Sequence, residues 1–229
     1  MTRESIVLAL AERIEQEMRS IGMWSDAPPP PGASEIKEAF GGSALSLEQW
    51  LQYVFLSRVR GACAEKSLPR TSEVGQRAYR EWVMHGPDDP RDRPLIELLF
   101  ELDGVVSFHP AIERIGFFET GRPAQSKHGR DLGDRFHQAD VRSIAWQLEL
   151  SHPDLPRALA IAFDWKYILE DGTLFAEQKL EITLDPSWKT SWHMSSWGFA
   201  GAGHWQKGTH TFVIRLWEAP FAEAKLTID

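Results

Sequence analysis

The spacing of hydrophobic residues changes near residue 105, and this change constrains the fold of the 229-residue chain more than any other feature. Before it, hydrophobic residues recur with the three-to-four-residue repeat of an amphipathic helix, in the stretches 6–21, 47–59, 74–83 and 95–102. After it, they alternate with other residues, as in strands with one buried face. Because two such patterns normally build two hydrophobic cores, we predict two domains, residues 1–105 and 106–229.

The first half is predicted to form a four-helix bundle. Ser46 followed by Gln49 has the pattern of a capping box, in which the hydroxyl and the amide each bond a backbone group at the start of a helix. The side chains of this helix that we expect to face inward are Leu47, Trp50, Leu51 and Val54. Upstream, the run 28–31 consists of four prolines, which cannot continue a helix and favour an extended polyproline conformation. We expect a rigid connector there, with a partner-binding motif as the alternative.

The second half is predicted to form an antiparallel β-sandwich. Seven strand candidates can be placed, at residues 114–119, 141–150, 157–168, 174–184, 192–199, 209–217 and 221–228. In the third candidate, the residues expected to share one buried face are Leu159, Ile161, Phe163, Trp165 and Tyr167. Seven short strands over about 120 residues are typical of an immunoglobulin-like sandwich. The predicted fold class is therefore α+β in two domains, a four-helix bundle followed by an antiparallel seven-stranded immunoglobulin-like β-sandwich.

Several residues of the helical half are similar to those of a known family. They are Trp24, the proline-rich loop, Ser34, Phe40, the run Glu48-Gln49-Trp50-Leu51-Gln52-Tyr53-Val54-Phe55-Leu56-Ser57-Arg58, Leu68-Pro69 and Leu102-Asp103. Through them the chain resembles, over about residues 1–105, the YqcC-like family of small bacterial α-helical proteins. The resemblance implies a helical fold. It implies no catalytic residue, because the family has no established activity.

The end of the chain also resembles a known module. A tryptophan, a glycine and an aromatic residue lead a strand that turns back into a final apolar strand, with Trp205, Gly208 and Phe212 in these positions. Together with Phe117-Phe118-Glu119 and Ile144-Ala145-Trp146, this pattern resembles an uncharacterised bacterial immunoglobulin-like β-sandwich module over about residues 110–229. The resemblance implies an added binding or assembly domain.

Charge and composition exclude several classes of partner. The formal net charge of −8 repels polyanions, so we expect no nucleic-acid partner, and the sequence has no apolar run long enough to span a membrane. Cys63 is the single cysteine and the N-terminus lacks the apolar core of a signal peptide, which favours the cytoplasm. Metal-ligand spacings and glycine-rich phosphate loops are not recognisable, so we expect no cofactor.

Seven residues are candidates for binding a ligand or partner, and we assign none as catalytic or as a metal ligand. They are Gln52 and Arg58 in the helical motif, Arg135 and His137 in the basic segment 122–142, and Trp192, Trp197 and Trp205 around a Ser- and Gly-rich stretch. Each has a structural alternative. Arg58 can pair within the bundle, the basic segment can be a solvated loop or carry a further strand, and the tryptophans can fill the end of the sandwich.

The leading functional hypothesis is a non-catalytic protein–protein interaction or adaptor protein. Its expected partner is an unidentified protein or a second copy of the chain, docked on either half. The alternative is a ligand-binding module that stacks a glycan or a peptide on the three tryptophans. An enzyme is the second alternative, because catalytic groups can assemble from distant positions, although the sequence contains no recognisable pairing of nucleophile and base.

Overall fold

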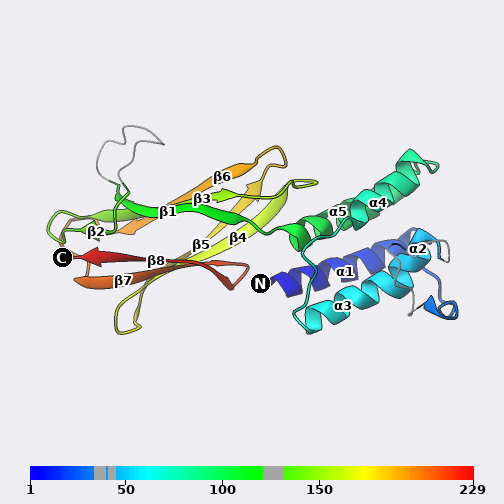
Figure 1. Ribbon diagram of the computed structural model, residues 1–229, viewed down its shortest axis with the longest axis horizontal. Coiled ribbons are helices and arrows are strands. Elements are labelled where there is room, and N and C mark those ends of the chain that lie inside the picture. The colour runs from blue at the N-terminus through cyan, green and yellow to red at the C-terminus, as the bar shows by residue number, and fades with distance from the viewer. Residues whose placement is uncertain (34–39, 41–44, 121–131) are drawn as a thin grey trace. The chain divides into compact units, whose positions relative to one another are not determined.

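The computed structural model describes residues 1–33, 40, 45–120 and 132–229 (Figure 1). These residues divide into a helical unit, Met1–Phe108 with Leu155–Leu159, and a β unit, His109–Asp154 with Ala160–Asp229. Ser34 and residues 122–131 of the basic segment lie outside the described residues. Independent folding of the domains 1–105 and 106–229 stays a prediction.

The described residues of the helical unit form four helical segments. They are α1 (Arg3–Ser20); α2 (Leu47–Trp50), continuing through the π-helical turn η3 (Leu51–Phe55) into α3 (Leu56–Ala64); α4 (Val74–Ala78) with the π-helical turn η4 (Tyr79–Met84); and α5 (Arg93–Ser107), preceded by the 3-10 turn η5 (Pro90–Asp92). The capping box is confirmed, because the Gln49 N–H donates to Ser46 Oγ and the Ser46 N–H donates to Gln49 Oε1. The four side chains expected to face inward from this helix are buried.

The helices contact one another in the succession α4, α5, α1, α3. Leu10, Ile14 and Met18 of α1 are buried against this core. Val7 and Ala11 are also buried, because α1 packs against helices on two sides and needs a broad apolar stripe.

The short segment Leu155–Leu159, from the second half of the sequence, packs within the helical unit. Leu155 and Leu159 are buried, and Arg157 Nη2 lies 2.8 Å from Glu97 Oε1 of α5. The Arg157 guanidinium also lies 4.9 Å from the centroid of the Phe100 ring, within the range of a cation–π contact. The helical core therefore includes residues from beyond position 106.

The described residues of the β unit form eight strands in two sheets. One sheet has the order β1 (Ala111–Glu119), β3 (Ser143–Ser151), β6 (Thr190–Gly198), and the other has the order β2 (Arg135–Phe136), β8 (Ala219–Ile228), β7 (Gly208–Leu216), β4 (Leu159–Ile168), β5 (Leu174–Leu184). The sheets pack face to face: the Trp146 ring of β3 lies 5.7 Å from Phe212 of β7 and 6.5 Å from Trp165 of β4, between ring centroids. The alternating burial predicted for β4 is confirmed.

The predicted fold class, a four-helix bundle followed by an antiparallel seven-stranded immunoglobulin-like sandwich, is wrong. The structure is mixed α+β, and its sheets have three and five strands. The strand absent from the prediction is β2, whose two residues pair in parallel with Thr227 and Ile228 of β8. Two residues are too short to leave an alternating pattern, so hydrophobic spacing alone cannot reveal such a strand.

Candidate functional site

Six rings meet at one end of the β unit and form a set that we call the aromatic cluster. It consists of Phe175 of β5, Trp197 of β6, Phe199, His204 and Trp205 of the segment after β6, and His210 of β7. The Trp197 ring centroid lies 5.0 Å from that of Phe175 and 4.8 Å from that of Phe199, at interplanar angles of 67° and 76°. Edge-to-face contacts of this kind are favourable between aromatic rings, so the cluster is a well-packed surface.

The local sequence explains why two of these rings lie together. Trp197 and Phe199 are two positions apart at the end of β6, so the alternation of an extended chain turns both side chains to one side. Gly198 between them lets β6 approach β3 closely. A Cβ atom at Gly198 would lie 2.4 Å from the carbonyl oxygen of Arg142 and 2.5 Å from the Cα of Ser143, so this position requires glycine.

The floor of the cluster is made by Trp205 and His210, both with 0% of their surface exposed. Trp205 Nε1 donates to the carbonyl oxygen of Arg142 at 3.2 Å, and His210 Nε2 lies 2.7 Å from the carbonyl oxygen of Gln206. Burial lowers the pKa of His210, so its ring is neutral at neutral pH. The rings of Phe175, Trp197 and Phe199 are half-buried and present their remaining surface to solvent.

A polar group of three residues adjoins the cluster. Asp229 lies 3.4 Å from Arg135 Nη1 and 2.6 Å from His137 Nδ1. Gln138 connects this group to the floor of the aromatic cluster. Its backbone N–H donates to the carbonyl oxygen of Asp229, and its side-chain amide donates to the carbonyl oxygen of Trp205 at 2.7 Å. The structure therefore brings Arg135 and His137 to the same end of the β unit as two of the predicted tryptophans.

The remaining predicted site residues lie elsewhere. Trp192 is five positions before Trp197 on β6 and therefore faces the opposite side of its sheet, where it is half-buried. Trp205 is fully buried and has no open ring face, so the three tryptophans do not form one platform. In the helical unit, Gln52 is buried in η3, and Arg58 is exposed on α3.

Sequence reasoning missed Phe175 and Phe199. Phe199 had a usable signal, because it follows Trp197 by two residues in a stretch predicted as a strand. Phe175 had none, because it lies more than 20 positions before Trp197 and the two residues meet only where β5 of one sheet packs against β6 of the other. The ring contact between them, like most contacts between sheets, depends on tertiary structure.

A buried pair of polar residues on β6 is a second candidate. Ser191 Oγ lies 2.8 Å from His193 Nε2, a geometry in which a histidine can activate a hydroxyl nucleophile. The two residues are only 5% and 6% exposed, so a substrate has no access to them. Burial, with a smaller contribution from His152, lowers the pKa of His193 to about 4. The pair is a satisfied internal hydrogen bond of the sandwich.

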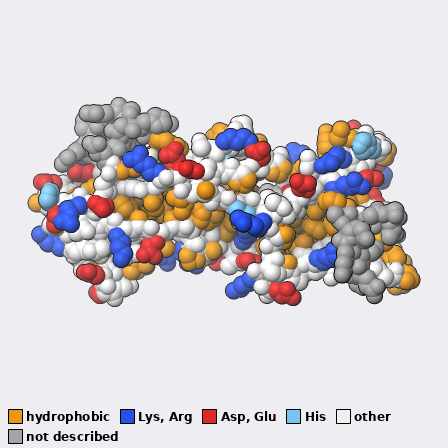
Figure 2. All heavy atoms as spheres, in the orientation of Figure 1, with side chains coloured by type: hydrophobic (Ala, Val, Ile, Leu, Met, Phe, Trp, Pro, Cys, Tyr) orange, Lys and Arg blue, Asp and Glu red, His pale blue; other side chains and the backbone are white. Residues whose placement is uncertain are grey.

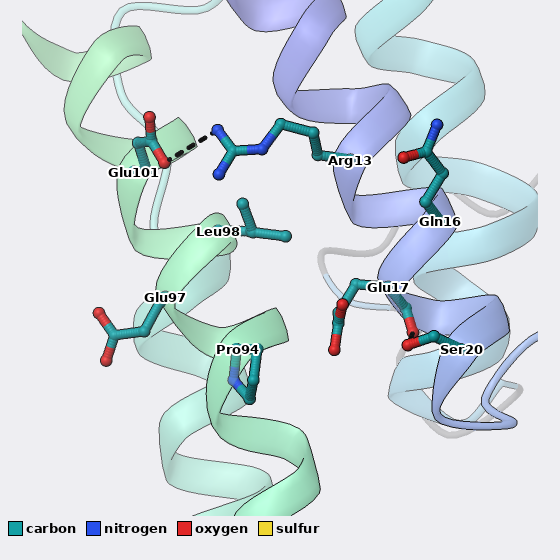
Figure 3. Close-up of a pocket in the computed structure, with 8 residues that line it drawn as sticks. All are labelled: Arg13, Gln16, Glu17, Ser20, Pro94, Glu97, Leu98 and Glu101. Atoms are coloured by element: carbon teal, nitrogen blue, oxygen red, sulfur yellow. Dashed lines mark hydrogen bonds and ion pairs between the residues drawn. The ribbon is translucent and has the colours of Figure 1, made fainter.

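A groove of 550 Å³ lies between α1 and α5 (Figure 3). Its lining residues are Arg13, Gln16, Glu17, Ser20, Pro94, Glu97, Leu98 and Glu101. Arg13 Nη1 lies 3.4 Å from Glu101 Oε2 across the groove, as the dashed line in Figure 3 marks. Three carboxylates against one guanidinium make the groove acidic, and its only apolar lining side chains are Pro94 and Leu98.

Within the described ranges, groups of three or more His, Cys, Asp or Glu residues placed to hold a metal ion do not occur. Each described helix is also too short or too polar to cross a membrane. On the face of the β unit in view in Figure 2, Lys and Arg side chains alternate with Asp and Glu.

Comparisons with known proteins support family-level similarity of the helical half. Residues 6–105, less than half of the chain, match the family model DUF446, described as tRNA pseudouridine synthase C. The solution structure of YqcC from E. coli is 22% identical and covers 47% of this chain and 90% of its own, with a TM-score of 0.41. The expected similarity to YqcC-like proteins is thus supported for the helical half.

Other solved structures match half of the chain or more. An immunoglobulin-like protein from Pseudomonas aeruginosa is 15% identical and covers 53% of this chain and 97% of its own, with a TM-score of 0.35. The DNA glycosylase AlkC of Pseudomonas fluorescens is 8% identical and covers 76% of this chain and 47% of its own, also with a TM-score of 0.35. No curated protein matches the chain. The chain is thus similar to the DUF446 family over residues 6–105, and it matches the structures of YqcC and of an immunoglobulin-like protein over about half of its length each.

Proposed function

We propose that this protein is a non-catalytic protein-binding or adaptor protein and that the aromatic cluster of the β unit is its binding surface. The observation that carries the proposal is that Phe175, Trp197 and Phe199 keep part of their surface open while resting on the buried rings of Trp205 and His210. Aromatic side chains that are already held in place bury a large area at low entropic cost. They are for this reason enriched among the residues that dominate protein interfaces.

The polar groups beside the cluster suit a peptide segment of a partner. Ser195 Oγ donates to Gln178 Oε1 at 3.1 Å, and both side chains reach the surface. Hydroxyl and amide groups can bond the N–H and C=O groups of an extended peptide. The charged groups nearby, Arg135 and His137, are balanced by Asp229, so they leave little net charge to attract a polyanion.

The second candidate is a role in tRNA modification, favoured by the description of the family model that matches residues 6–105. It ranks below the first because a net charge of −8 opposes binding of a polyanion. Incubation of the purified chain with unmodified tRNA, followed by chemical detection of pseudouridine, separates the two. Formation of pseudouridine would overturn the non-catalytic proposal.

We place this function in the cytoplasm. Cys63 is the single cysteine of the sequence and is buried, so the fold requires no oxidising compartment. Burial also raises the pKa of the Cys63 thiol, which keeps the thiol protonated and unreactive at neutral pH.

The test compares the wild-type chain with Trp197→Ala and with a matched control, Trp188→Ala. Trp188 is 46% exposed and lies outside the cluster, in the turn between β5 and β6, so its replacement removes an exposed ring of the same kind. Each full-length chain is immobilised and exposed to extract from its native cell, after its melting temperature is shown to match the wild type. We expect one protein to be captured by the wild type and by Trp188→Ala and lost with Trp197→Ala.

Two outcomes contradict the proposal. Equal capture by all three chains would place the binding surface elsewhere. Quenching of tryptophan fluorescence by a soluble glycan, dependent on Trp197 and without protein capture, would favour a glycan-stacking module instead.

A further inference from the structure

The proline run of the helical unit consists of residues that favour the backbone conformation of a polyproline ligand. Proline fixes φ near −65°, and a residue that precedes a proline is driven towards extended backbone, so Pro28 through Pro30 favour a left-handed polyproline II conformation. Pro28, Pro29 and Pro31 are exposed, and Pro30 is half-buried. The segment therefore presents proline rings to solvent.

The structure holds this segment in place at both ends. Gln52 bonds both backbone groups of Ser25, accepting from its N–H at 2.9 Å and donating to its carbonyl oxygen at 2.5 Å. The hydroxyl of Tyr53 donates to the carbonyl oxygen of Ala27 at 2.9 Å. The N–H of buried Ala33 donates to the carbonyl oxygen of Pro30 at 3.0 Å. A segment held in its binding conformation loses little further entropy when it binds.

We propose that the proline run of one copy binds the aromatic cluster of a second copy of this chain. The inference rests on the proposed function of that cluster and names its occupant. Polyproline II segments are recognised by aromatic surfaces, because proline rings pack on ring faces and the preformed helix carries a low entropic cost. The half-exposed rings of Phe175, Trp197 and Phe199, inclined at large angles to one another, offer ring faces in more than one direction.

Each of the two surfaces has an exposed charged residue close to it. Asp26 lies two residues before the first proline of the run, and its side chain is 96% exposed, with Arg19 Nη1 at 3.6 Å from its Oδ1. Next to the cluster, Arg142 is exposed, and its carbonyl oxygen accepts from the N–H of Phe199 and from Trp205 Nε1. An exposed carboxylate before the proline run and an exposed arginine whose backbone bonds two residues of the cluster would set the direction of the bound segment.

The test is sedimentation equilibrium of the full chain over a wide range of concentrations. The wild-type mass should rise with concentration from 26.0 kDa towards twice that value, and the control Trp188→Ala should behave alike. Trp197→Ala and the double variant Pro28→Ser with Pro29→Ser should each associate at least about tenfold more weakly. A mixture of these two variants should recover association, because one retains the proline run and the other retains the cluster. Far-ultraviolet circular dichroism and melting curves check that each variant is folded.

A second measurement uses the peptide Met23–Ala33 as a probe of the ¹⁵N-labelled chain. The Trp197 indole resonance, assigned by its loss in Trp197→Ala, should shift on addition of the peptide and stay in place with the serine-substituted peptide. A wild-type chain that stays at 26.0 kDa with no peptide-induced shift, or a variant mixture that fails to associate, overturns the inference. Capture of a foreign protein through Trp197 by a chain that stays monomeric would leave the proposed function standing while this inference fails.

Discussion

Replacement of Asp103 by alanine should destabilise the helical unit by about 2 to 4 kcal/mol. Asp103 lies on α5 with 3% of its surface exposed, yet it caps a different helix. Its Oδ1 accepts from the N–H of Val74 at 3.0 Å and from Ser72 Oγ at 2.5 Å, and its Oδ2 accepts from the N–H of Gly75 at 2.8 Å. Glu73, the residue that precedes α4, makes no side-chain cap of its own.

The magnitude follows from these bonds. Loss of a capping carboxylate costs about 1 kcal/mol, and each buried N–H left without an acceptor costs about 1 to 3 kcal/mol. Part of this cost is offset, because the variant no longer has to bury a carboxylate. Asp103→Asn is the matched control. It keeps the size of the side chain and one acceptor oxygen, so its loss of stability should be about half as large.

The pH dependence gives the same reasoning a separate test. Burial raises the pKa of Asp103 although the surrounding hydrogen bonds oppose the shift. The folded chain therefore binds this proton more tightly than the unfolded chain does. The stability gained from protonation is complete below the unfolded pKa of about 3.9 and is lost as pH rises through the folded pKa. The stability difference between the wild type and Asp103→Asn should consequently shrink as pH rises from about 4.

Urea denaturation followed by the helical circular dichroism signal at several pH values measures both effects. The full chain is used, because the helical unit includes Leu155–Leu159. An alanine variant within about 1 kcal/mol of the wild type, or one no less stable than Asp103→Asn, would refute the capping argument. A wild-type-to-asparagine difference that grows with pH would refute the sign of the pKa shift.

Three further substitutions test other contacts. Gly198→Ala should lower the stability measured in a melting experiment by about 2 kcal/mol or more, because the added Cβ would overlap the β3 backbone. Gly201→Ala is the control and should be nearly neutral, because its Cβ would lie 3.7 Å from the nearest atom, His204 Nε2. The pKa of His193 is lowered to about 4 in the folded chain, so between pH 6.5 and pH 4 the unfolded chain binds this proton more tightly than the folded chain does. The free energy of unfolding should therefore fall by up to about 3 kcal/mol as pH drops through this range. His193→Gln should flatten that dependence, and His137→Gln, at an exposed position, should leave it intact. Leu159→Ala should lower the free energy of unfolding by about 2 to 4 kcal/mol, because Leu159 is buried in the helical core. A destabilisation seen in the β-sheet circular dichroism signal and not in the helical signal would contradict this place for Leu159.

Local patterns of the sequence predicted the elements better than their assembly. All four helical stretches and all seven strand candidates correspond to observed elements, and the Ser46 capping box is present as predicted. These features depend on residues within a few positions of one another. The two-residue strand β2 and the meeting of Phe175 with Trp197 depend on residues far apart in the chain, so hydrophobic spacing carries no signal for them.

The hairpin between β7 and β8 shows how a local rule can also fail. Its two central residues, Trp217 and Glu218, have φ angles of 49° and 63°, a conformation usually supplied by Asn-Gly. Neither residue is a turn signal, yet Trp217 is buried. Tertiary burial of the tryptophan offsets the backbone strain, which no local pattern reveals.

The polar residues that carry the similarity to YqcC-like proteins turn out to close the helical unit. Glu48 accepts a hydrogen bond from Trp82 Nε1 at 2.7 Å, Gln52 binds the backbone of Ser25, and Asp103 caps α4. Asp103 satisfies buried donors that α4 alone leaves without partners, and Glu48 and Gln52 join separate segments of the helical unit, so all three have a structural role. A polar motif near a core therefore identifies a fold here without identifying a reaction. Under the functions proposed above, binding instead uses side chains that remain partly open, as at Trp197, and a segment that such a motif holds in place, as Gln52 holds the residues before the proline run.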